Sequence, residues 1–505
     1  MQSYRTWLRP LTVVVLGVAF LILIALTYKW PLVGDAQVFH YATFLVDHGY
    51  RPYKDITDIN LPGTYLMEGA AIHLFGGSDM AWRAYDFSMV ITIGIAAIVI
   101  AAPYDWLAGL FGAVLFSVMH AIDGARNTAE RDEAMAMMLM VSYAFVFEGL
   151  RRRKAWMLAP PGFLMAFACS MKPTFAPLVI ALFAMVWYTL RRRGEAAMPY
   201  LAYGFAGLVG AVALVLGYLL HHDSLGALIY ISRTITPYYS KLIQLNRGEL
   251  LNGALTGVLK VILPLGLITL YANRSWKNWE RPALLLGVLG GAFSYFIQGK
   301  AYSHHRYPMI AFLSLWLGIE FLLAMRRSER WLQAVGAIGF AAGMAALPFY
   351  LLRTARLPTP NFYSPALVKD LDRLGPDRLQ HKVQCIDLVD GCFNALYRLK
   401  ILPSSGSLGD LLYFADVPSP VVDEYRGLLQ KELAANPPSV IVVSNVWYVR
   451  RLNTFDKLKQ WPAFATYLNN EYDLAITRSF PIEDDSAYRI YTRKGADLPA
   501  LPTGN

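Results

Sequence analysis

Carboxylates gather just after the first long apolar stretch of this sequence, where they could act as bases at a membrane surface. The segment 34–65 contains Asp35, Asp47, Asp55 and Asp58. Apolar residues at helical spacing in 36–46 predict an amphipathic helix whose apolar face lies on the bilayer or on neighbouring helices, followed by a loop and a second helix starting near Leu61. The acids could serve catalysis, or they could only keep a loop between two membrane helices hydrated.

A second group of charges lies between residues 120 and 132, just ahead of another apolar stretch. It contains Asp123, Arg126, Glu130, Arg131 and Asp132. Acids favour a helix amino terminus because of the helix dipole, and the arginines could simply pair with them. The alternative is that Glu130 or Asp132 completes a catalytic site around Asp35.

Two further segments carry cations that could hold a phosphate. Lys172 lies in the short turn 170–174, and Lys300, His304, His305 and Arg306 lie within 298–308. An arginine fork suits phosphate oxygens, whereas a lysine or arginine near a helix end can also reach the lipid headgroups. The paired histidines leave a divalent metal open as a cofactor, but no ligand spacing specifies one, so no metal ligands are predicted.

The composition indicates a membrane protein, in which several apolar helices would position these residues. Of the 505 residues, 56% are apolar. A span needs about 20 residues. Eleven segments are candidates, namely 10–29, 84–102, 106–122, 133–150, 156–171, 174–190, 199–220, 251–272, 282–298, 308–325 and 332–352.

The net charge of +10 does not indicate nucleic-acid binding, because the basic residues lie between the apolar segments rather than in one patch. Clusters follow the fourth, sixth, eighth and tenth segments, at 151–154, 191–193, 274–281 and 326–330. These clusters fall on one side of the membrane if eleven spans alternate, and the positive-inside rule makes that side the cytoplasm. The amino terminus is therefore expected inside, and the acidic loops and the carboxyl terminus outside.

The composition changes after Arg353. Residues 354–505 lack long apolar runs and alternate strand-like stretches (383–389, 440–444, 476–480 and 488–492) with helical patterns (365–375, 392–400, 420–435 and 455–471). This alternation predicts a small extracytoplasmic α/β domain. Cys385 and Cys392 could form a disulfide there, or remain two thiols.

Together these features resemble the GT-C superfamily of integral membrane glycosyltransferases, particularly the branch that contains protein mannosyltransferases and the bacterial aminoarabinose transferase. The resemblance is carried by Gly34-Asp35, the pattern 49–55 followed by 60–65, Glu130-Arg131-Asp132, Lys172-Pro173 and Arg306-Tyr307-Pro308. It implies a polytopic α-helical protein with about eleven transmembrane helices. The expected domains are a catalytic one, 1–353, and an extracytoplasmic α/β one, 354–505.

The resemblance implies a sugar donor on a polyprenyl phosphate, with Asp35 as the catalytic base. Further candidate catalytic acids are Asp55, Asp58, Glu130 and Asp132, and candidate substrate- or phosphate-binding residues are Tyr65, Arg126, Lys172, Lys300, His304 and Arg306. Family members often have a second acid beside the first, or a Lys-Pro pair before the second span. This chain has Ala36 and Leu61-Pro62 instead, which leaves the second acid and the phosphate-binding lysine open.

The chemistry of sugar transfer leads to the same expectation independently of the family resemblance. A phosphate that leaves from C1 of a sugar carries negative charge, so the site needs fixed cations, while a carboxylate accepts the proton of the attacking hydroxyl. One displacement of this kind inverts the anomeric centre. The expected enzyme lies in the inner (plasma) membrane and contacts membrane lipid, the lipid-linked donor and an extracytoplasmic glycan, lipid or protein acceptor.

The sequence also leaves two other functions open. A membrane ligase or polymerase would take a whole glycan from a lipid diphosphate. A lipid-linked sugar transporter or flippase would more often carry charges at mid-membrane and show two similar halves.

Overall fold

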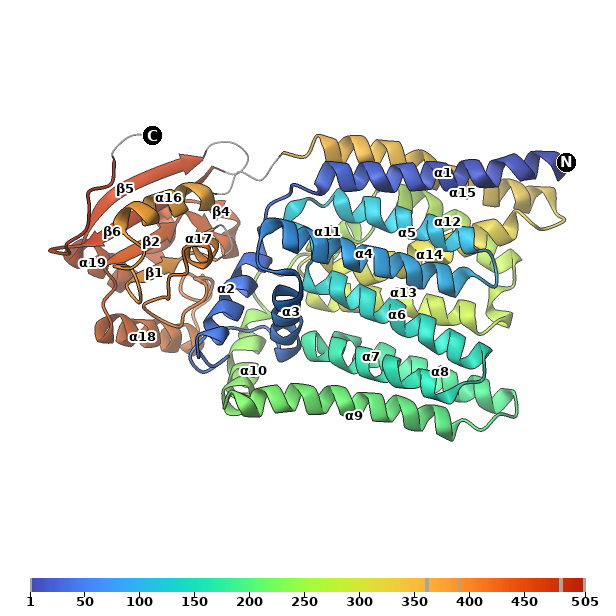
Figure 1. Ribbon diagram of the computed structural model, residues 1–505, viewed down its shortest axis with the longest axis horizontal. Coiled ribbons are helices and arrows are strands. Elements are labelled where there is room, and N and C mark those ends of the chain that lie inside the picture. Colours follow the sequence, from blue (N-terminus) through green and yellow to red (C-terminus); the bar gives the residue numbers. More distant parts are fainter. Residues whose placement is uncertain (1, 359–362, 389–390, 481–484, 503–505) are drawn as a thin grey trace.

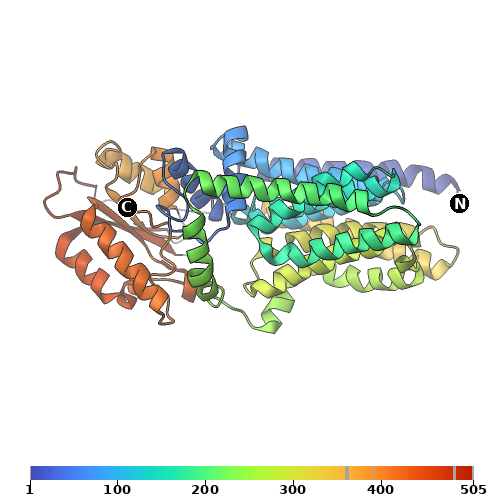
Figure 2. The same ribbon diagram turned by 90° about the horizontal axis from the view of Figure 1, so that it is seen from below.

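The computed structural model describes residues 2–358, 363–388, 391–480 and 485–502. Long helices lie side by side at one end of the molecule, and a small sheet with its own helices forms the other end (Figure 1). The amino terminus lies at the far end of the helical part in both views (Figures 1 and 2).

Ten of the eleven apolar segments predicted from the sequence are helical along most of their length, and the segment 251–272 is divided between two helices. The helices are α1 (Gln2–Thr27), α4 (Asp79–Ala101), α5 (Trp106–Ala121), α6 (Arg131–Arg151), α7 (Ala159–Met171), α8 (Ala176–Arg192), α9 (Met198–His221), α12 (Gly257–Ala272), α13 (Glu280–Gln298), α14 (Tyr307–Ala324) and α15 (Arg330–Ala355). Helix α11 (Arg247–Ala254) precedes α12 and meets it at 82°.

Fewer of these helices than predicted meet the requirements for a membrane span. Within the described residues, seven are long and apolar enough, or eight if the bent pair of α11 and α12 counts as one span. The expected count of about eleven is therefore higher than length and composition support. Helices α5 and α7 have only 16 and 13 residues, and α13 carries Glu280 and Arg281 in its first turn.

Helix α14 forms the centre of the helical part, since 94% of the residues in its apolar stretch are buried inside the protein. Close contact with α5 depends on Gly112, where a Cβ atom would lie 2.7 Å from the backbone of Leu315. A glycine at such a crossing lets two helices approach closely without a side chain between them.

Three short helices lie between the long helices and the sheet, namely α2 (Asp35–Asp47), α3 (Pro62–Phe75) and α10 (Leu225–Tyr239) (Figure 1). The 3₁₀ turns η1 (Ala125–Asn127), η3 (Pro173–Phe175) and η5 (Ser303–Arg306) connect α5 to α6, α7 to α8 and α13 to α14. The turns η2 (Ala155–Leu158) and η4 (Ser275–Lys277) connect other helices. The helix predicted over 36–46 is α2, and the one predicted near Leu61 is α3.

The carboxyl-terminal part contains α16 (Ser364–Leu374), β1 (Val383–Ile386), α17 (Cys392–Leu399), α18 (Pro420–Ala435), β2 (Val440–Ser444), β3 (Val446–Trp447), η6 (Tyr448–Arg450), β4 (Leu452–Asn453), η7 (Phe455–Gln460), α19 (Pro462–Glu471), β5 (Tyr472–Phe480) and β6 (Ser486–Arg493). The sheet order is β1-β2-β6-β5, with β1 parallel to β2 and the other pairs antiparallel. The predicted strand 383–389 ends at Ile386, and Val389 lies outside the described residues.

Both faces of the sheet are covered, which explains the unbroken apolar run in β2. Val440 and Val442 pack in one cluster with residues of α16 and α17, while Ile441 and Val443 pack in another with residues of α18 and α19. Neighbouring strand residues point to opposite faces, so a strand covered on both sides needs apolar residues throughout.

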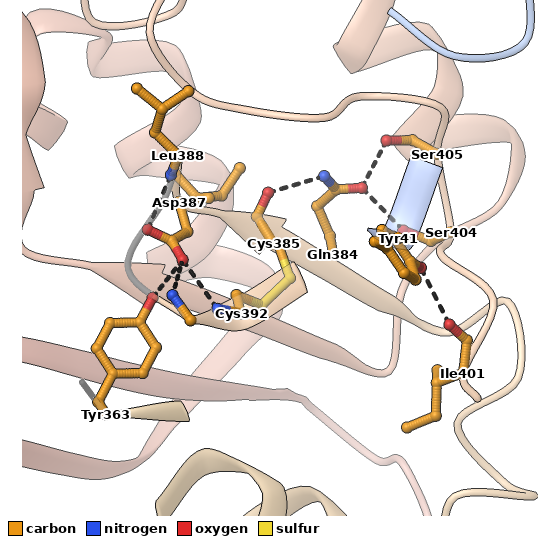
Figure 3. The surroundings of a disulfide bond; sticks show 12 residues. Tyr41, Tyr363, Gln384, Cys385, Asp387, Leu388, Cys392, Ile401, Ser404 and Ser405 are labelled. Carbon is orange, nitrogen blue, oxygen red and sulfur yellow. Dashed lines mark hydrogen bonds between the residues drawn. A yellow bond between two sulfur atoms is a disulfide. The ribbon is translucent and has the colours of Figure 1, made fainter. Parts of the chain in front are cut away.

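A disulfide stabilises the part of this domain that docks on α2. Cys385 and Cys392 are bonded, with Cα atoms 6.0 Å apart. The carboxylate of Asp387 accepts hydrogen bonds from the backbone N–H groups of Gly391 and Cys392 at the start of α17, at 3.2 and 2.9 Å (Figure 3). Helix α17 packs against α2, and the Tyr41 hydroxyl of α2 donates to the Ile401 carbonyl at 3.0 Å. The domain thus supports the helix that begins with Asp35.

Candidate active site

Helix α2 begins with Asp35 because the preceding glycine permits a sharp turn. Gly34 has a φ of 73°, and a Cβ there would lie 2.8 Å from the carbonyl oxygen of Arg126. A residue with a side chain would be strained by this conformation and blocked by this contact. Asp35 follows as the first helical residue, where the dipole favours a carboxylate, and its side chain is 38% exposed.

A cavity of about 420 Å³ contains the Asp35 carboxylate and most of the predicted cations. Its charged and polar lining includes Asp35, Asp58, Arg131, Lys172, Lys300, His304, His305, Tyr239, Tyr302 and Tyr448. The rest is largely apolar, with Val38 and Phe39 from α2, Ile297 from α13 and Leu412 from the carboxyl-terminal part. We call this space the first cavity. A mostly apolar cavity with a few convergent polar groups is typical of a small-ligand site.

Arg131 is the counter-ion of Asp35. Its guanidinium Nη2 lies 3.6 Å from Asp35 Oδ2, and its Nη1 donates to the side-chain oxygen of Asn60. It also lies 5.2 Å from the centre of the Phe39 ring. The sequence predicted no contact between Arg131 and Asp35, whereas in the structure Arg131 connects the second loop to Asp35 and to the first loop.

Asp58 lines the first cavity but has its oxygens engaged by neighbours. Oδ1 accepts hydrogen bonds from the backbone N–H groups of Ile59 and Asn60, at 2.7 and 3.1 Å, and from the side-chain Nδ2 of Asn60, at 2.7 Å. Oδ2 accepts from the Tyr65 hydroxyl at 2.9 Å. Burial nevertheless raises the pKa of Asp58. These contacts suit a residue that orders the loop, and Tyr65 contributes by holding Asp58.

Two lysines line the first cavity, and they differ in their hydrogen-bond partners. Lys172 Nζ donates to Asp132 Oδ2 at 2.6 Å, and burial lowers the pKa of Lys172. Lys300 Nζ lies 3.2 Å from the centre of the Tyr239 ring and has no hydrogen-bond partner among the described residues. Burial, followed by repulsion from Lys172 and Arg131, lowers the pKa of Lys300 to about 7. A buried ammonium without an anionic partner is a ready phosphate ligand.

Several predicted residues lie around the first cavity without lining it. Asp132 is fully buried beneath Lys172. Glu130 is 3% exposed, and burial followed by the nearby Asp35 carboxylate raises its pKa well above the ordinary value. Glu68 of α3, which the sequence interpretation did not select, is also buried, and burial raises its pKa to about 8. Each of these acids lies close enough to affect the cavity's charge, but does not open onto it.

The remaining predicted residues lie elsewhere. Asp55 is held by Arg51, whose Nε lies 2.8 Å from Oδ2. Arg306 donates to the Gly253 carbonyl at 2.8 Å and to Asp123 Oδ1 at 2.6 Å, while the preceding His304 and His305 face the first cavity. The turn η5 thus directs neighbouring side chains to different sides.

Arg126 lines a second cavity, of about 410 Å³, that shares Lys300, Tyr302 and Tyr448 with the first. Sequence reasoning missed this second space altogether, because its other wall comes from the carboxyl-terminal part. Nothing in the local sequence around Tyr448 indicates that it faces a loop some 150 positions earlier. Tyr302 lies between Lys300 and His304, so its proximity to them in sequence was the one signal available.

A divalent metal was left open by the paired histidines, and one group of donors lies beside the first cavity. Ligand atoms of Asp132, His304 and His305 lie within 4.8 Å of one another. One carboxylate and two imidazoles can bind zinc. However, the Lys172 ammonium already neutralises Asp132, and His304 Nδ1 is 3.0 Å from the Asn127 side-chain oxygen. A cation in this position competes with a metal, so we assign no step to one.

A second buried group joins Asp86, His120 and Glu133. Asp86 Oδ2 lies 2.9 Å from Arg83 Nη1, and the backbone N–H of Ala129 donates to Asp86 and Glu133 at 2.7 and 2.9 Å. Its carboxylates therefore already hold an arginine and the turn that precedes Glu130.

No protein-family profile and no curated protein matches this sequence. Solved structures of ArnT from Cupriavidus metallidurans are similar to it. The one bound to undecaprenyl phosphate is 12% identical, with 95% of this chain and 97% of that chain covered and a TM-score of 0.54. The one in the apo state is 13% identical, with 97% and 98% covered and a TM-score of 0.48. From the first of these, the chain has the fold of ArnT.

Proposed function

We propose that this protein is an inverting membrane glycosyltransferase that moves a sugar from a polyprenyl phosphate to an extracytoplasmic acceptor. The observation that carries the proposal is the first cavity, where the Asp35 carboxylate and the Lys172 and Lys300 ammonium groups share one largely apolar space. A base for the acceptor and cations for the departing phosphate are the two requirements of such a transfer.

In the proposed step, the acceptor oxygen attacks C1 of the sugar while its proton passes to the Asp35 carboxylate. The bond between C1 and the phosphate oxygen breaks, and its electron pair leaves with the polyprenyl phosphate. Lys300 stabilises that charge, and Lys172 can contribute, because an ammonium has three N–H donors and Asp132 occupies one. Attack from the face opposite the phosphate inverts the anomeric centre.

The choice of carrier rests on the fold and on the cavity wall. The similar ArnT structure contains undecaprenyl phosphate. In this chain, Ile297 lines the first cavity and is also 57% exposed on the outer surface of α13. A prenyl chain could therefore leave the cavity past Ile297 and continue along the membrane-facing surface of the helices.

The proposed membrane orientation follows from the charges. The basic clusters at 151–154, 191–193 and 326–330 lie at the ends of α6, α8 and α14. These ends belong on the cytoplasmic side by the positive-inside rule. The first cavity lies at the opposite, extracytoplasmic ends, where α6 begins with Arg131 and α13 ends next to Lys300.

We assign catalysis to residues 1–353 and covering of the site to residues 354–505. Asp35, Lys172 and Lys300 come from the first part, whereas Leu412 and Tyr448 reach the first cavity from the second. In this arrangement the small domain excludes water from the donor phosphate, which strengthens every charge interaction around it.

The test is transfer of labelled sugar from polyprenyl phosphate by purified Asp35→Asn protein. Removing a general base typically lowers a rate by about 10²–10⁴-fold. Asp47→Asn is the matched control, since Asp47 lies on the same helix, is 45% exposed and faces His73 rather than the cavity. The proposal predicts loss of turnover in Asp35→Asn and retained turnover in Asp47→Asn, with carrier binding intact in both. Turnover by Asp35→Asn at the native rate would refute the role of Asp35.

A further inference from the structure

Helix α10 ends at the first cavity with Tyr239, and the residues that follow it continue to the second cavity. Tyr239 and Ser240 line the first cavity, whereas Ile243 and Leu245 line the second. We call residues 240–245 the strap. The strap therefore forms part of the wall of both cavities.

The Tyr239 ring lies against the ammonium group of Lys300. Lys300 Nζ is 3.2 Å from the centre of that ring, and it has no hydrogen-bond partner within the described part of the chain. The face of an aromatic ring attracts a cation, and the attraction is strongest where water is excluded. Because Lys300 is only 5% exposed, the ring is an effective partner for its charge.

Both ends of the strap are held by hydrogen bonds. Ahead of it, the Tyr238 hydroxyl donates to the Val417 carbonyl at 2.6 Å, which attaches the end of α10 to the carboxyl-terminal part. At its other end, the backbone N–H of Leu245 donates to the Gly299 carbonyl at 2.9 Å, next to Lys300. Tyr239 can therefore turn away from Lys300 by a rearrangement of the strap alone, while the helices on either side keep their places.

The strap contains a strained residue. Ile243 has a φ of 61°, in the left-handed region that a side chain branched at Cβ rarely adopts. Such strain costs free energy and occurs often in segments that change conformation. A rearrangement that returns Ile243 to a negative φ would release the strain. The strap thus has a physical reason to adopt a second arrangement once Tyr239 leaves Lys300.

We propose that the Tyr239 ring competes with the phosphate of the carrier for Lys300, so that Tyr239 and the strap form a gate that the phosphate opens. The identity of the carrier rests on the proposed function, and the gate regulates access to that same site. A charge-assisted hydrogen bond from the ammonium to a phosphate oxygen can replace the ring, whereas an uncharged lipid offers nothing in exchange. Tyr239 acts through Lys300 and takes no part in bond breaking.

The experiment compares Tyr239→Leu with Tyr239→Phe. Leucine keeps an apolar side chain but removes the aromatic face, whereas phenylalanine keeps the face and removes only the hydroxyl. The measurement is the dissociation constant of labelled undecaprenyl phosphate for the full-length purified proteins at pH 6, below the Lys300 pKa of about 7. Since the ring competes with the phosphate, we expect Tyr239→Leu to bind the carrier roughly two- to thirtyfold more tightly than Tyr239→Phe.

A second pair of variants tests the cation. When Lys300→Met is combined with each Tyr239 variant, the difference between leucine and phenylalanine should disappear, because the ring then has no ammonium to attract. A difference of the same size without Lys300 would overturn the proposal, since the ring would then act through packing alone.

Ile243→Gly tests the strap and should act in the opposite direction. Glycine adopts a positive φ without strain, so this substitution stabilises the arrangement in which Tyr239 covers Lys300. We expect the native protein to bind the carrier about fivefold or more tightly than Ile243→Gly. Melting temperatures verify that each variant is folded, and a general loosening of the fold cannot strengthen binding in one variant and weaken it in the other.

Three results would overturn the gate. Tyr239→Leu could bind the carrier no more tightly than Tyr239→Phe, or more weakly, which would make the ring neutral or a part of the phosphate site. An unchanged affinity in Ile243→Gly would remove the strap from the gate.

Failure of the proposed function gives a different result. If that function is wrong, the native protein transfers no sugar from the carrier, yet the order of affinities among the variants persists for undecaprenyl phosphate. If only the gate is wrong, the native protein binds the carrier and transfers sugar, and the Tyr239 variants bind with equal affinity. No binding of undecaprenyl phosphate by any of these proteins would overturn both.

Discussion

We expect carrier binding to depend on pH because of Lys300, and we expect the substitution Lys300→Arg to remove that dependence. Burial lowers the pKa of Lys300 to about 7 from its ordinary value of 10.5. An anionic carrier binds the charged form, so this contribution is present below pH 7 and is lost as the pH rises through that value. The charged fraction falls from about nine tenths at pH 6 to about one tenth at pH 8, so the affinity should fall roughly tenfold.

Lys300→Arg tests this directly, because a guanidinium stays protonated throughout this range. The measurement is the dissociation constant of labelled undecaprenyl phosphate at pH 6, 7 and 8 for the native protein and the variant. Titration of the carrier's own phosphate affects both proteins equally, so the ratio of their constants isolates residue 300. We expect that ratio to change by about tenfold between pH 6 and pH 8. A constant ratio would refute the assignment of Lys300 as a phosphate ligand.

The burial of Lys300 also affects the stability of the fold, where its charged form is unfavourable. A lysine whose pKa is lower in the folded than in the unfolded protein destabilises the fold at low pH, and this cost disappears as the pH rises from about 7 toward its unfolded value. Lys300→Met should therefore raise the melting temperature at pH 6 while weakening carrier binding. A lower melting temperature would show that Lys300 has a stabilising partner instead.

Two further substitutions test residues outside the first cavity. Arg306→Ala should cost about 3–5 kcal/mol of stability because it leaves the buried Asp123 unpaired. The folded fraction should keep its carrier affinity, and the double variant Arg306→Gln/Asp123→Asn should recover part of the lost stability. Loss of carrier binding without loss of stability would contradict this assignment. Cys385→Ser with Cys392→Ser should lower stability by roughly 2–3 kcal/mol, seen as unfolding at lower denaturant, and a variant as stable as the native protein under oxidising conditions would show that the disulfide is dispensable.

The helices were predictable from sequence because each depends on a local property. An apolar run long enough to cross a bilayer is helical in lipid, whatever follows it, since its backbone hydrogen bonds must be made within the segment. The break between α2 and α3 follows from residues in the loop itself, namely Gly49, Pro52 and Pro62. The number of spans was less predictable, because short apolar helices such as α5 resemble spans in composition.

The sequence predicted that Asp35, Lys172 and Lys300 lie near one another, because all three were expected on the same side of the membrane. It did not predict the ion-pair partners of the cations. Lys172 and Arg306 were equally good phosphate ligands by residue type. Their difference arises from tertiary pairing, with Asp132 for one and Asp123 for the other. The contribution of Tyr448 depends on how the carboxyl-terminal part docks, and no local pattern encodes that.

An experimental density map of the protein with undecaprenyl phosphate would test the proposed site most directly. We expect the phosphate in the first cavity, within hydrogen-bond distance of Lys300 Nζ and facing Asp35, with the prenyl chain leaving past Ile297. A phosphate bound in the second cavity, or outside both cavities with Lys300 still covered by Tyr239, would contradict it.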